Sequence, residues 1–582
     1  MKYPSIDDSD FYEKISKIYK RFTIPKAKKT FDEICFPKKF QLQLPQEFLA
    51  EYLNPNTPYK GVLVYHRIGA GKTCTAVRIA ETWKKDRNIL VVVPASLKGN
   101  FRGELRTQCA DNSYLKPSER KRLAQLPPTD SEYLKIINKS DQRIDKIYSI
   151  YSYNKFVELA KDDEISLTNT LLIIDEIQNM VSEEGTYYQT LYDLIQDAPK
   201  DLRIVLLSAT PMFDKPNEIA LTMNLLRLPV ELPTGREFYK MFVRVIKKRN
   251  GTYIYKTKNM DYFKSCIKGY VSYFRGAPPY VFPTLRIRYV KCEMSEFQYS
   301  AYKEVSKQEE KEYNRNHLKR NIKDIGAIKA LTIKNLPNNF FIGARIVSNI
   351  VFPNRKLDEA GFASFKGKYI TENLEKYSIK FHKMMTRISG SGGKIIIYSS
   401  FKGYGGITSF RRVLETFGYK NYADDGPGVK RYALWTGDED VETKNEVREV
   451  YNNPNNLGGR QLKILILSAS GKEGLSTTAV TQMHILEPYW NQSRIDQVIG
   501  RASRFCSHKD VAEEKRIVRV YVYLAVHPDE PETVDQYMFN LSTQKNKLID
   551  EFEKAIKEVA FDCELFKNAN TFEDEDKIEC DK

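Results

Sequence analysis

Residues 65–73 read YHRIGAGKT, and they are the first stretch of the chain whose residue types and spacing could do chemistry. Gly69 and Gly71 allow the backbone to turn tightly and to direct its amide groups at phosphate oxygens. Lys72 would reach the β- and γ-phosphates of a nucleotide, and the hydroxyl of Thr73 would bind Mg²⁺. A helix that starts directly after the glycines adds the partial positive charge of its N-terminus. The stretch therefore predicts a site for ATP and Mg²⁺.

This loop departs from the usual phosphate-loop pattern at one position. The pattern is glycine, four residues, glycine, lysine and then serine or threonine, and His66 stands where its first glycine would be. That glycine only opens the loop, so a histidine there is compatible with nucleotide binding. The alternative is a chance GxGKT after a strand. The loop residues that we expect to contact ATP are His66, Arg67, Ile68, Gly69, Ala70, Gly71, Lys72 and Thr73.

Two acidic residues close a later apolar run, in LLIIDEIQ at 171–178. Asp175 is placed to hold Mg²⁺ through water, and Glu176 to orient and deprotonate the water that attacks the γ-phosphate. A strand followed by a solvated acidic loop is the alternative, but the preceding phosphate loop makes the catalytic interpretation the stronger one. The sequence thus predicts Thr73 and Asp175 as metal ligands and Glu176 as a catalytic residue.

LLSATP at 206–211 again places small polar residues at the end of an apolar run. Ser208 and Thr210 could sense the two acids and pass the signal across a domain interface. We therefore expect Ser208, Ala209 and Thr210 to couple hydrolysis to movement.

QVIGRASR at 497–504 supplies two arginines far from the phosphate loop in the sequence. Residues three apart on a helix lie on one face, so Arg501 and Arg504 would be suited to stabilise charge on a transferring phosphoryl group. An exposed basic helix is the alternative. The preceding Gln497 and Gly500 favour the catalytic interpretation.

The segments around these motifs alternate between short β-rich apolar runs and helical patterns. This alternation is typical of a parallel sheet with crossover helices, and it occurs twice along the chain. The expected strands are 61–65, 89–94, 171–175, 203–208, 394–400, 433–435, 463–470 and 518–525. The chain therefore looks like two α/β domains.

The composition is that of a globular protein, with 582 residues of which 41% are hydrophobic and 29% charged. The formal charge of +17 indicates a polyanionic partner, most simply nucleic acid. No signal peptide is visible, and no apolar run reaches the roughly 18 residues of a membrane span. The eight cysteines are scattered without a Cys-x-x-Cys pair, which predicts reduced thiols and no zinc site.

Taken in order, the motifs resemble those of superfamily 2 helicases and DNA translocases, whose two RecA-like domains clamp ATP between them. The signs of that family stand here as LQLPQEF with Gln46, GAGKT, DEIQ, SATP, SASGKEGLS at 468–476 and QVIGRASR. Six motifs in the right order, over residues 40–510, are highly specific. The resemblance implies that Gln46 reads the adenine edge of ATP, and that Gly474, Gln497 and Gly500 take part in coupling.

Within the superfamily, further runs resemble the viral transcription ATPases of poxviruses and other large DNA viruses, namely nucleoside triphosphatase I and the small subunit of the early transcription factor. These runs are HRIGAGKT, NLLRLP at 224–229, GKIIIYSSFKGYGG at 393–406, ILEPYWNQSRIDQVIGRASRFCSH at 485–508 and VDQYMFNLSTQKNK at 534–547. On this resemblance His66 marks a branch of the family. One departure is Gln178, which stands where DExx motifs more usually have histidine; its amide can still bridge to the arginine motif by a hydrogen bond.

The resemblance also implies a division of the chain. The expected parts are an N-terminal extension at 1–39, a RecA-like ATP-binding domain at 40–235, a largely helical linking region at 236–375, a second RecA-like domain at 376–545, and a C-terminal helix with an acidic tail at 546–582. We expect the tail from residue 572 to be disordered. The linking region could carry basic surface or be a solvated linker, and its aromatic stretch at 270–282 could hide a wedge that splits a duplex.

The expected function is a nucleic-acid-stimulated ATPase motor that uses ATP and Mg²⁺ and serves transcription of a large DNA virus. Expected partners are nucleic acid, DNA rather than RNA, and a viral RNA polymerase or transcription factor subunit; no membrane is expected. The expected location is the virion and the host cytoplasm. Alternatives are a strand-separating RNA or DNA helicase, the motor part of a restriction system, and a binding protein with an inactive ATPase fold.

Overall fold

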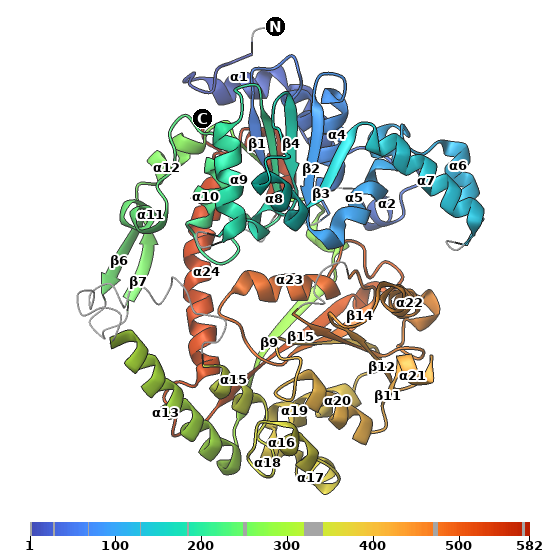
Figure 1. Ribbon diagram of the computed structural model, residues 1–582, viewed down its shortest axis with the longest axis vertical. Helices are drawn as coiled ribbons and strands as arrows, with labels where there is room; N and C mark the ends of the chain where they lie inside the picture. The colour runs from blue at the N-terminus through green and yellow to red at the C-terminus, as the bar shows by residue number, and fades with distance from the viewer. Residues whose placement is uncertain are drawn as a thin grey trace. The chain divides into compact units, whose positions relative to one another are not determined.

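The computed structural model divides the chain into two compact units (Figure 1). The first unit consists of Met1–Pro278 and Lys547–Lys582, and the second of Pro279–Asn546. Each unit is built around its own sheet. The residues that the structure describes are 3–26, 29–67, 69–127, 130–182, 185–247, 253–318, 341–469, 475–572 and 577–582.

The first unit contains a six-stranded sheet in which every pairing is parallel. Its strands, in the order in which they lie side by side, are β3 (Tyr148–Ser152), β2 (Asn88–Val93), β4 (Thr170–Ile174), β5 (Arg203–Ser208), β1 (Gly61–His66) and β8 (Val271–Phe274). Every residue of β1 and β4 is buried, as expected of strands covered on both faces. Because β4, β5 and β1 are parallel neighbours, the segments that follow them leave the same edge of the sheet.

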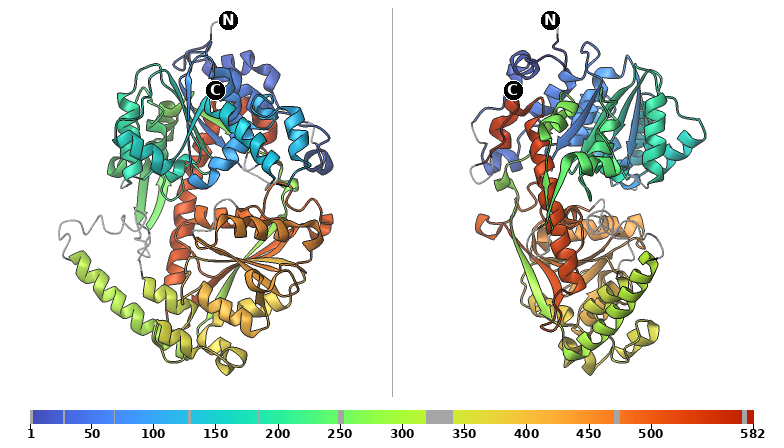
Figure 2. Two further views of the ribbon diagram at one scale, coloured as in Figure 1. Left: turned by 45° about the vertical axis from the view of Figure 1, so that its right-hand side comes forward. Right: turned by 90° about the vertical axis from the view of Figure 1, so that its left-hand side faces the viewer.

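Helices lie on both sides of this sheet (Figure 2). They are α1 (Phe11–Ile18), α2 (Phe31–Cys35), α3 (Leu44–Tyr52), α4 (Lys72–Trp83), α5 (Lys98–Leu105), α6 (Pro117–Leu123), α7 (Ser131–Asp145), α8 (Tyr153–Lys161), α9 (Thr186–Asp197), α10 (Glu218–Asn224), α11 (Gly235–Phe242), α12 (Met260–Ile267) and α25 (Cys563–Asn570). An antiparallel hairpin, β6 (Val243–Lys247) with β7 (Tyr253–Thr257), also belongs to this unit.

The second unit contains a seven-stranded sheet, again with parallel pairings throughout. Its strands, in spatial order, are β11 (Lys420–Asn421), β12 (Arg431–Trp435), β13 (Ile464–Ser468), β10 (Lys394–Ser399), β14 (Val480–Ile485), β15 (Ile517–Val526) and β9 (Thr284–Glu293). Its helices are α13 (Glu296–Leu318), α15 (Ile342–Asn349), α16 (Glu359–Ser364), α17 (Lys368–Thr371), α18 (Leu374–Tyr377), α19 (Ile379–Ser389), α20 (Ile407–Thr416), α21 (Tyr422–Asp425), α22 (Val441–Asn452) and α23 (Gln492–Ala502). The long helix α24 (Val534–Glu558) begins in the second unit and ends in the first.

The expectation of an α/β fold with two parallel sheets is confirmed, and each expected strand is present. In the sequence, the boundary between the two units falls between Pro278 and Pro279, inside the expected linking region at 236–375. The reason is that two of its strands complete the sheets: β8 pairs with β1, and β9 pairs with β15 along its whole length. Among the described helices, none combines the length and the apolar character that crossing a membrane requires.

Both ends of the chain pack into the core of the first unit. Phe11 and Ile15 of α1 are fully buried in the same apolar cluster as Phe552 and Ile556 of α24. Residues 1–39 are therefore not a separate extension where the structure describes them.

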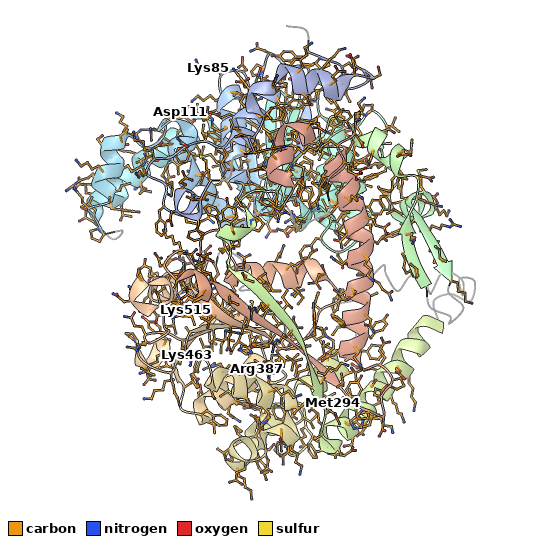
Figure 3. The ribbon with its side chains drawn as sticks, turned by 180° about the vertical axis from the view of Figure 1, so that it is seen from behind. Lys85, Asp111, Met294, Arg387, Lys463 and Lys515 are labelled. Carbon is orange, nitrogen blue, oxygen red and sulfur yellow. A yellow bond between two sulfur atoms is a disulfide. The ribbon has the colours of Figure 1, made fainter. Side chains whose placement is uncertain are left out.

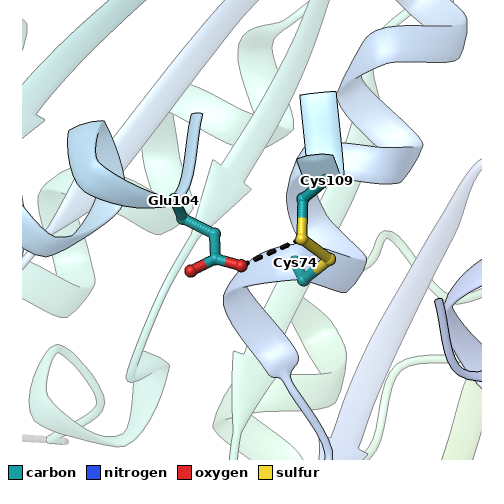
Figure 4. A group of neighbouring side chains, drawn as sticks. All are labelled: Cys74, Glu104 and Cys109. Atoms are coloured by element: carbon teal, nitrogen blue, oxygen red, sulfur yellow. Dashed lines mark hydrogen bonds between the residues drawn. A yellow bond between two sulfur atoms is a disulfide. The ribbon is translucent and has the colours of Figure 1, made fainter. Parts of the chain in front are cut away.

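Six cysteines are disulfide-bonded, so the expectation of reduced thiols is wrong for them, while Cys266 and Cys292 are free. Cys74 is bonded to Cys109, beside the carboxyl group of Glu104 (Figure 4), and Cys563 is bonded to Cys580. The second bridge ties down the chain end, where Oδ1 of Asp581 also lies 2.9 Å from Nζ of Lys264. The expectation of a disordered tail is therefore wrong for 577–582, while 573–576 lie outside the described residues.

Candidate nucleotide site

The phosphate loop connects the end of β1 to the start of α4. Gly69 has a φ of 85° and Gly71 a φ of 67°, in the left-handed region that glycine adopts without strain. A Cβ on Gly71 would lie 2.4 Å from Nε2 of Gln46, so this position also needs glycine for space. Lys72 and Thr73 are the first two residues of α4 and are half-buried. The loop thus delivers a lysine and a hydroxyl at the positive end of a helix.

Gln46, in α3, braces this loop with its side-chain amide. Its Nε2 donates to the carbonyl oxygens of Ala70 at 3.4 Å and Gly71 at 3.3 Å, and its Oε1 accepts from the backbone N–H of Gln43 at 2.9 Å. Nε2 of Gln43 reaches the carbonyl oxygen of Gly69 at 3.4 Å. Both ends of the Gln46 amide thus have partners within the protein. Reading of adenine by Gln46 stays a prediction.

His66 is fully buried at the end of β1 and belongs to a chain of three side chains. Its Nε2 lies 2.9 Å from Oγ of Ser272, and that hydroxyl donates to Oδ2 of Asp562. Oδ1 of Asp562 accepts from the backbone N–H of Tyr273 at 2.9 Å. Burial, with the charge of Lys72, lowers the pKa of His66 to about 3, and burial raises the pKa of Asp562 to about 7. The imidazole is therefore neutral at pH 7.

Arg67 ties the start of the loop to β8 and to α24. Its backbone N–H donates to the carbonyl oxygen of Phe274 at 3.0 Å, and its Nη2 lies 3.3 Å from Oε2 of Glu553. Burial opposes ionisation of Glu553, but the charges of Lys557 and Arg67 outweigh it and hold the pKa of that carboxyl below its ordinary value. In this structure the guanidinium of Arg67 is thus paired within the protein.

Asp175 and Glu176 follow β4 and face the loop lysine. Nζ of Lys72 lies 3.6 Å from Oε1 of Glu176. Burial and then the charge of Glu176 raise the pKa of Asp175 to about 7, although Lys72 opposes this. Glu176 has a φ of 51°, a strained value for a non-glycine residue, and the Tyr153 hydroxyl donates to the carbonyl oxygens of Asp175 at 2.5 Å and Glu176 at 3.0 Å. The structure brings together the lysine and the two acids that the sequence singles out.

Gln178 connects these acids to the segment after β5. Its Nε2 donates to Oε2 of Glu176 at 2.6 Å, and its Oε1 accepts from Oγ of Ser208 at 2.7 Å. Oγ of Ser208 accepts in turn from the backbone N–H of Thr210 at 3.0 Å, so Ala209 lies within a closed turn. Gln178 and Ser208 are both buried. A continuous path of hydrogen bonds therefore runs from the Glu176 carboxylate to the SATP segment.

The two arginines of QVIGRASR belong to the second unit, at the end of α23. The helix ends at Ala502, so the expectation that Arg501 and Arg504 share one helical face is wrong; the residue after Ala502 has a φ of −116° and a ψ of 87°. Both guanidinium groups nevertheless donate to the carbonyl oxygen of Leu475, Nη1 of Arg501 at 3.3 Å and Nη2 of Arg504 at 3.2 Å. Both arginines thus donate to the same carbonyl oxygen.

Of the remaining predicted positions, Gln497 and Gly500 lie half-buried in α23, whereas Ile68 and Gly474 lie outside the described residues. Sequence reasoning missed the residues that brace the site from elsewhere: Gln43, Tyr153, Ser272, Glu553 and Asp562. The spacing of Gln43 and Gln46, typical of a capping box, could have indicated the first of these. No local signal marks the contact of Ser272 with Asp562, which are 290 residues apart.

Comparison with known proteins finds a family model, similar sequences and a solved structure. Residues 46–339 match the family model described as SNF2-related domain. A protein of Acanthamoeba polyphaga mimivirus named "Putative ATP-dependent RNA helicase R563" is 50% identical over 583 residues, which cover 100% of this chain and 99% of the relative. A "Termination factor NPH-I homolog" of African swine fever virus is 27% identical over 570 residues, covering 87% of this chain and 76% of the relative. A solved structure, the Sulfolobus solfataricus SWI2/SNF2 ATPase core in complex with dsDNA, matches with a TM-score of 0.31 and 16% identity, covering 89% of this chain and 95% of that one.

Proposed function

We propose, from the premise that this chain belongs to the SNF2-related family of superfamily 2 helicases and ATPases, that it hydrolyses ATP to ADP and phosphate to move along duplex DNA. The observation that carries hydrolysis is the set of contacts at the ends of β1, β4 and β5. There Lys72 lies 3.6 Å from Glu176, and Glu176 is connected through Gln178 to Ser208. Positioning of water and phosphate by groups of this kind is most of what phosphoryl transfer requires.

Each residue of the site has a proposed role in this reaction. Thr73 and Asp175 would hold Mg²⁺, which when bound neutralises the negative charge of the phosphates. Lys72 would bind the γ-phosphate, and Glu176 would orient the attacking water and accept its proton. Arg501 and Arg504 would stabilise the charge that develops on the transferring phosphoryl group, as the family resemblance implies.

Coupling of hydrolysis to movement is proposed to pass through the Gln178 amide. Its two ends are both engaged, one with Glu176 and one with Ser208, so a shift of the carboxylate pulls on the SATP segment. A glutamine can transmit that shift without changing its charge, unlike the histidine that is more usual at this position. Ser208 then relays it to the backbone at Thr210.

Movement without strand separation is supported by the position of the aromatic stretch at 270–282. Tyr270, Tyr273 and Phe274 are buried, and all of β8 lies within the first sheet. These rings could reach a duplex only if the strand left the sheet. The stretch is therefore a poor candidate for a wedge, although Tyr280 is 39% exposed.

The biological setting is proposed from the relatives. We propose that the protein acts in transcription of a large DNA virus, with a viral RNA polymerase or transcription factor as partner, in the virion and the host cytoplasm. The support is the 27% identity to a protein named a termination factor homologue. The charge of +17 supports nucleic acid as the track.

The test is the ATPase rate of the full chain with duplex DNA, single-stranded DNA and RNA in turn. We expect duplex DNA to raise the rate most, because a bound track favours the hydrolysing conformation. The stimulation should fall steeply with salt, since phosphate contacts release counterions. A rate that no nucleic acid changes would refute the proposal. Greater stimulation by RNA would favour the second candidate, an RNA helicase, which is the name of the relative at 50% identity.

A further inference from the structure

Three arginines lie side by side on one face of the second sheet. Arg286 of β9 is the Cα partner of Arg519 of β15, and Arg288 is the partner of Tyr521. Paired residues of parallel strands project from the same face, and neighbouring strands lie about 4.8 Å apart. Arg286 and Arg519 are therefore immediate neighbours, with Arg288 two positions along the strand. All three arginines are exposed.

Helix α19 adds two basic side chains at the border of this group. Nζ of Lys383 donates to the carbonyl oxygen of Lys291 in β9 at 2.7 Å. The guanidinium of Arg387 lies 5.1 Å from the ring centre of Tyr521 and 5.8 Å from that of Tyr523 (Figure 3). We call the five basic residues the arginine face: Arg286, Arg288, Lys383, Arg387 and Arg519.

The elements that carry this charge supply no acidic residue to balance it. The strand β9 up to Cys292, the strand β15 and the helix α19 contain no aspartate or glutamate. Within the described part of the chain, no residue of the arginine face has an ion pair with a carboxylate. Beneath the face, burial and then the charge of Arg387 lower the pKa of His484 to about 3, so that ring stays neutral. Like charges placed as neighbours on a sheet cost stability unless an anion binds them.

We propose that the arginine face binds the phosphodiester backbone of a nucleic acid at a site separate from ATP. Guanidinium groups stay charged and can bind phosphate in a bidentate manner. A protein partner would instead need an exposed apolar anchor at the centre of the contact. On this face Tyr521 and Tyr523 are buried, and the exposed Leu285, Ile287 and Tyr289 of β9 project from the opposite face. Contacts to the backbone add affinity without reading sequence. The proposal goes beyond hydrolysis, since this binding requires neither ATP nor turnover.

The test is the salt dependence of duplex DNA binding by the full chain without nucleotide, measured by fluorescence anisotropy. The variant combines Arg286→Gln, Arg288→Gln and Arg519→Gln. Each phosphate contact contributes about 0.9 to the slope of log affinity against log salt. We therefore expect the slope to become shallower by about 2 to 3 and the affinity at low salt to fall by about tenfold or more.

A matched control removes the same number of positive charges elsewhere in the second unit, by combining Lys366→Gln, Lys368→Gln and Arg448→Gln on and beside α17 and on α22. The control should keep the slope of the unchanged protein. The arginine-face variant should unfold at the same temperature as the unchanged protein or higher, because a repulsion is removed. An unchanged slope in that variant, or equal losses in variant and control, would overturn the proposal; an unchanged slope would leave a protein partner as the occupant.

A second inference rests on the chain of His66, Ser272 and Asp562 in the first unit. Above its pKa of about 7 Asp562 is ionised and can only accept, so the Ser272 hydroxyl donates its proton to it. Oγ of Ser272 can then only accept from His66, which places the ring proton on Nε2. Nδ1 remains an acceptor, and it is buried without a hydrogen-bond partner among the described residues.

We infer that Asp562, acting through Ser272, fixes this tautomer of His66 and presents the Nδ1 acceptor to the phosphate loop. Ser272 and Asp562 are then positioning residues for ATP binding, a role that rests on the proposed function. The chain joins three distant segments, the end of β1, the strand β8 and the start of α25. A glycine at position 66 would have no such contact.

The variant Asp562→Asn tests the direction of the hydrogen bonds that connect His66, Ser272 and Asp562. The amide of the variant can donate to Ser272 and so reverse each of these hydrogen bonds. We expect the ¹⁵N NMR signature of His66, recorded above pH 7 where Asp562 is ionised, to change from the Nε2–H to the Nδ1–H tautomer. The KM for ATP should rise by roughly tenfold, the equivalent of one buried hydrogen bond, with a smaller change in kcat. The signal of His66 is identified by its loss in His66→Gln.

The NMR readout separates this inference from the proposed function, since it does not depend on turnover. An unchanged tautomer in Asp562→Asn would overturn the inference even if hydrolysis changed. An unchanged KM with a reversed tautomer would also overturn it, because the acceptor would then have no role in ATP binding. Ser272→Ala, which interrupts the chain, should raise KM to a similar degree.

Discussion

Removal of Gln178 should cut the nucleic-acid-stimulated ATPase rate by far more than removal of Ser208, although the two side chains touch. Gln178 donates to the Glu176 carboxylate at 2.6 Å, a charge-assisted bond, whereas Ser208 donates to the neutral Oε1 of Gln178 at 2.7 Å. Hydrogen bonds to charged groups contribute about 1.5–3 kcal/mol and neutral ones about 1 kcal/mol. At about 1.4 kcal/mol for each tenfold change, Gln178→Ala should lower kcat by roughly 10- to 150-fold and Ser208→Ala by about fivefold.

The double variant, Gln178→Ala with Ser208→Ala, tests whether the two residues act along one path. If Ser208 acts on Glu176 through the Gln178 amide, then Ser208→Ala has no further effect once that amide is gone. The double variant should match Gln178→Ala, with a coupling energy of about 1 kcal/mol. The assay is steady-state ATP hydrolysis with saturating duplex DNA, with circular dichroism to confirm folding.

Thr222→Val is a matched control, because it removes a buried hydroxyl of the first unit that has no hydrogen-bond partner among the described residues. It should leave kcat within about twofold of the unchanged protein, since no hydrogen bond is lost. Multiplicative losses in the double variant, with a coupling energy near zero, would refute the path from Glu176 to Ser208.

Three further predictions concern the pair of Lys72 and Glu176, the recognition of adenine by Gln46, and the buried carboxyl group of Asp562. Lys72→Ala should abolish hydrolysis and Glu176→Gln should bind ATP without hydrolysing it, as measured by phosphate release and nucleotide binding; normal turnover in either folded variant would remove the catalytic assignment. Gln46→Ala should weaken ATP binding because it removes the brace on the loop, and equal use of ATP and GTP by both proteins would show that Gln46 does not read adenine. Burial raises the pKa of Asp562 to about 7 from an ordinary 3.8, so its stabilising effect is complete below pH 3.8 and is lost as the pH rises to 7. The unchanged protein should therefore lose stability relative to Asp562→Asn as the pH rises from 3.8 to 7. The difference in unfolding free energy, variant minus unchanged protein, should increase by up to about 4 kcal/mol. A difference that does not change with pH would contradict the raised pKa.

The core of the site could be predicted because its signals are local. The glycines, Lys72 and the acids Asp175 and Glu176 lie in short motifs at the ends of apolar strands, and neighbouring parallel strands bring such ends together. These predictions needed only the motif order and the strand pattern. Ser208 was expected to sense the acids, but its connection to Glu176 through the Gln178 amide was not expected.

The rest of the site could not be predicted because it depends on distant contacts. Ser272 and Asp562 meet 290 residues apart, and Glu553 reaches Arg67 across 486 residues. The strand β9 was missed because arginine and lysine alternate with its apolar residues, a pattern that also fits a solvated segment. The disulfides were missed because the spacing of scattered cysteines gives no pairing.

The most direct test of ATP-driven movement is displacement of a third strand from a DNA triplex by the full chain, measured beside separation of an ordinary duplex. A motor that moves along duplex DNA without opening it displaces the third strand in an ATP-dependent way, and Lys72→Ala does not. We expect that result, with little or no separation of the duplex. ATP-driven separation of the duplex with no third strand displaced would contradict movement along duplex DNA and identify a helicase instead.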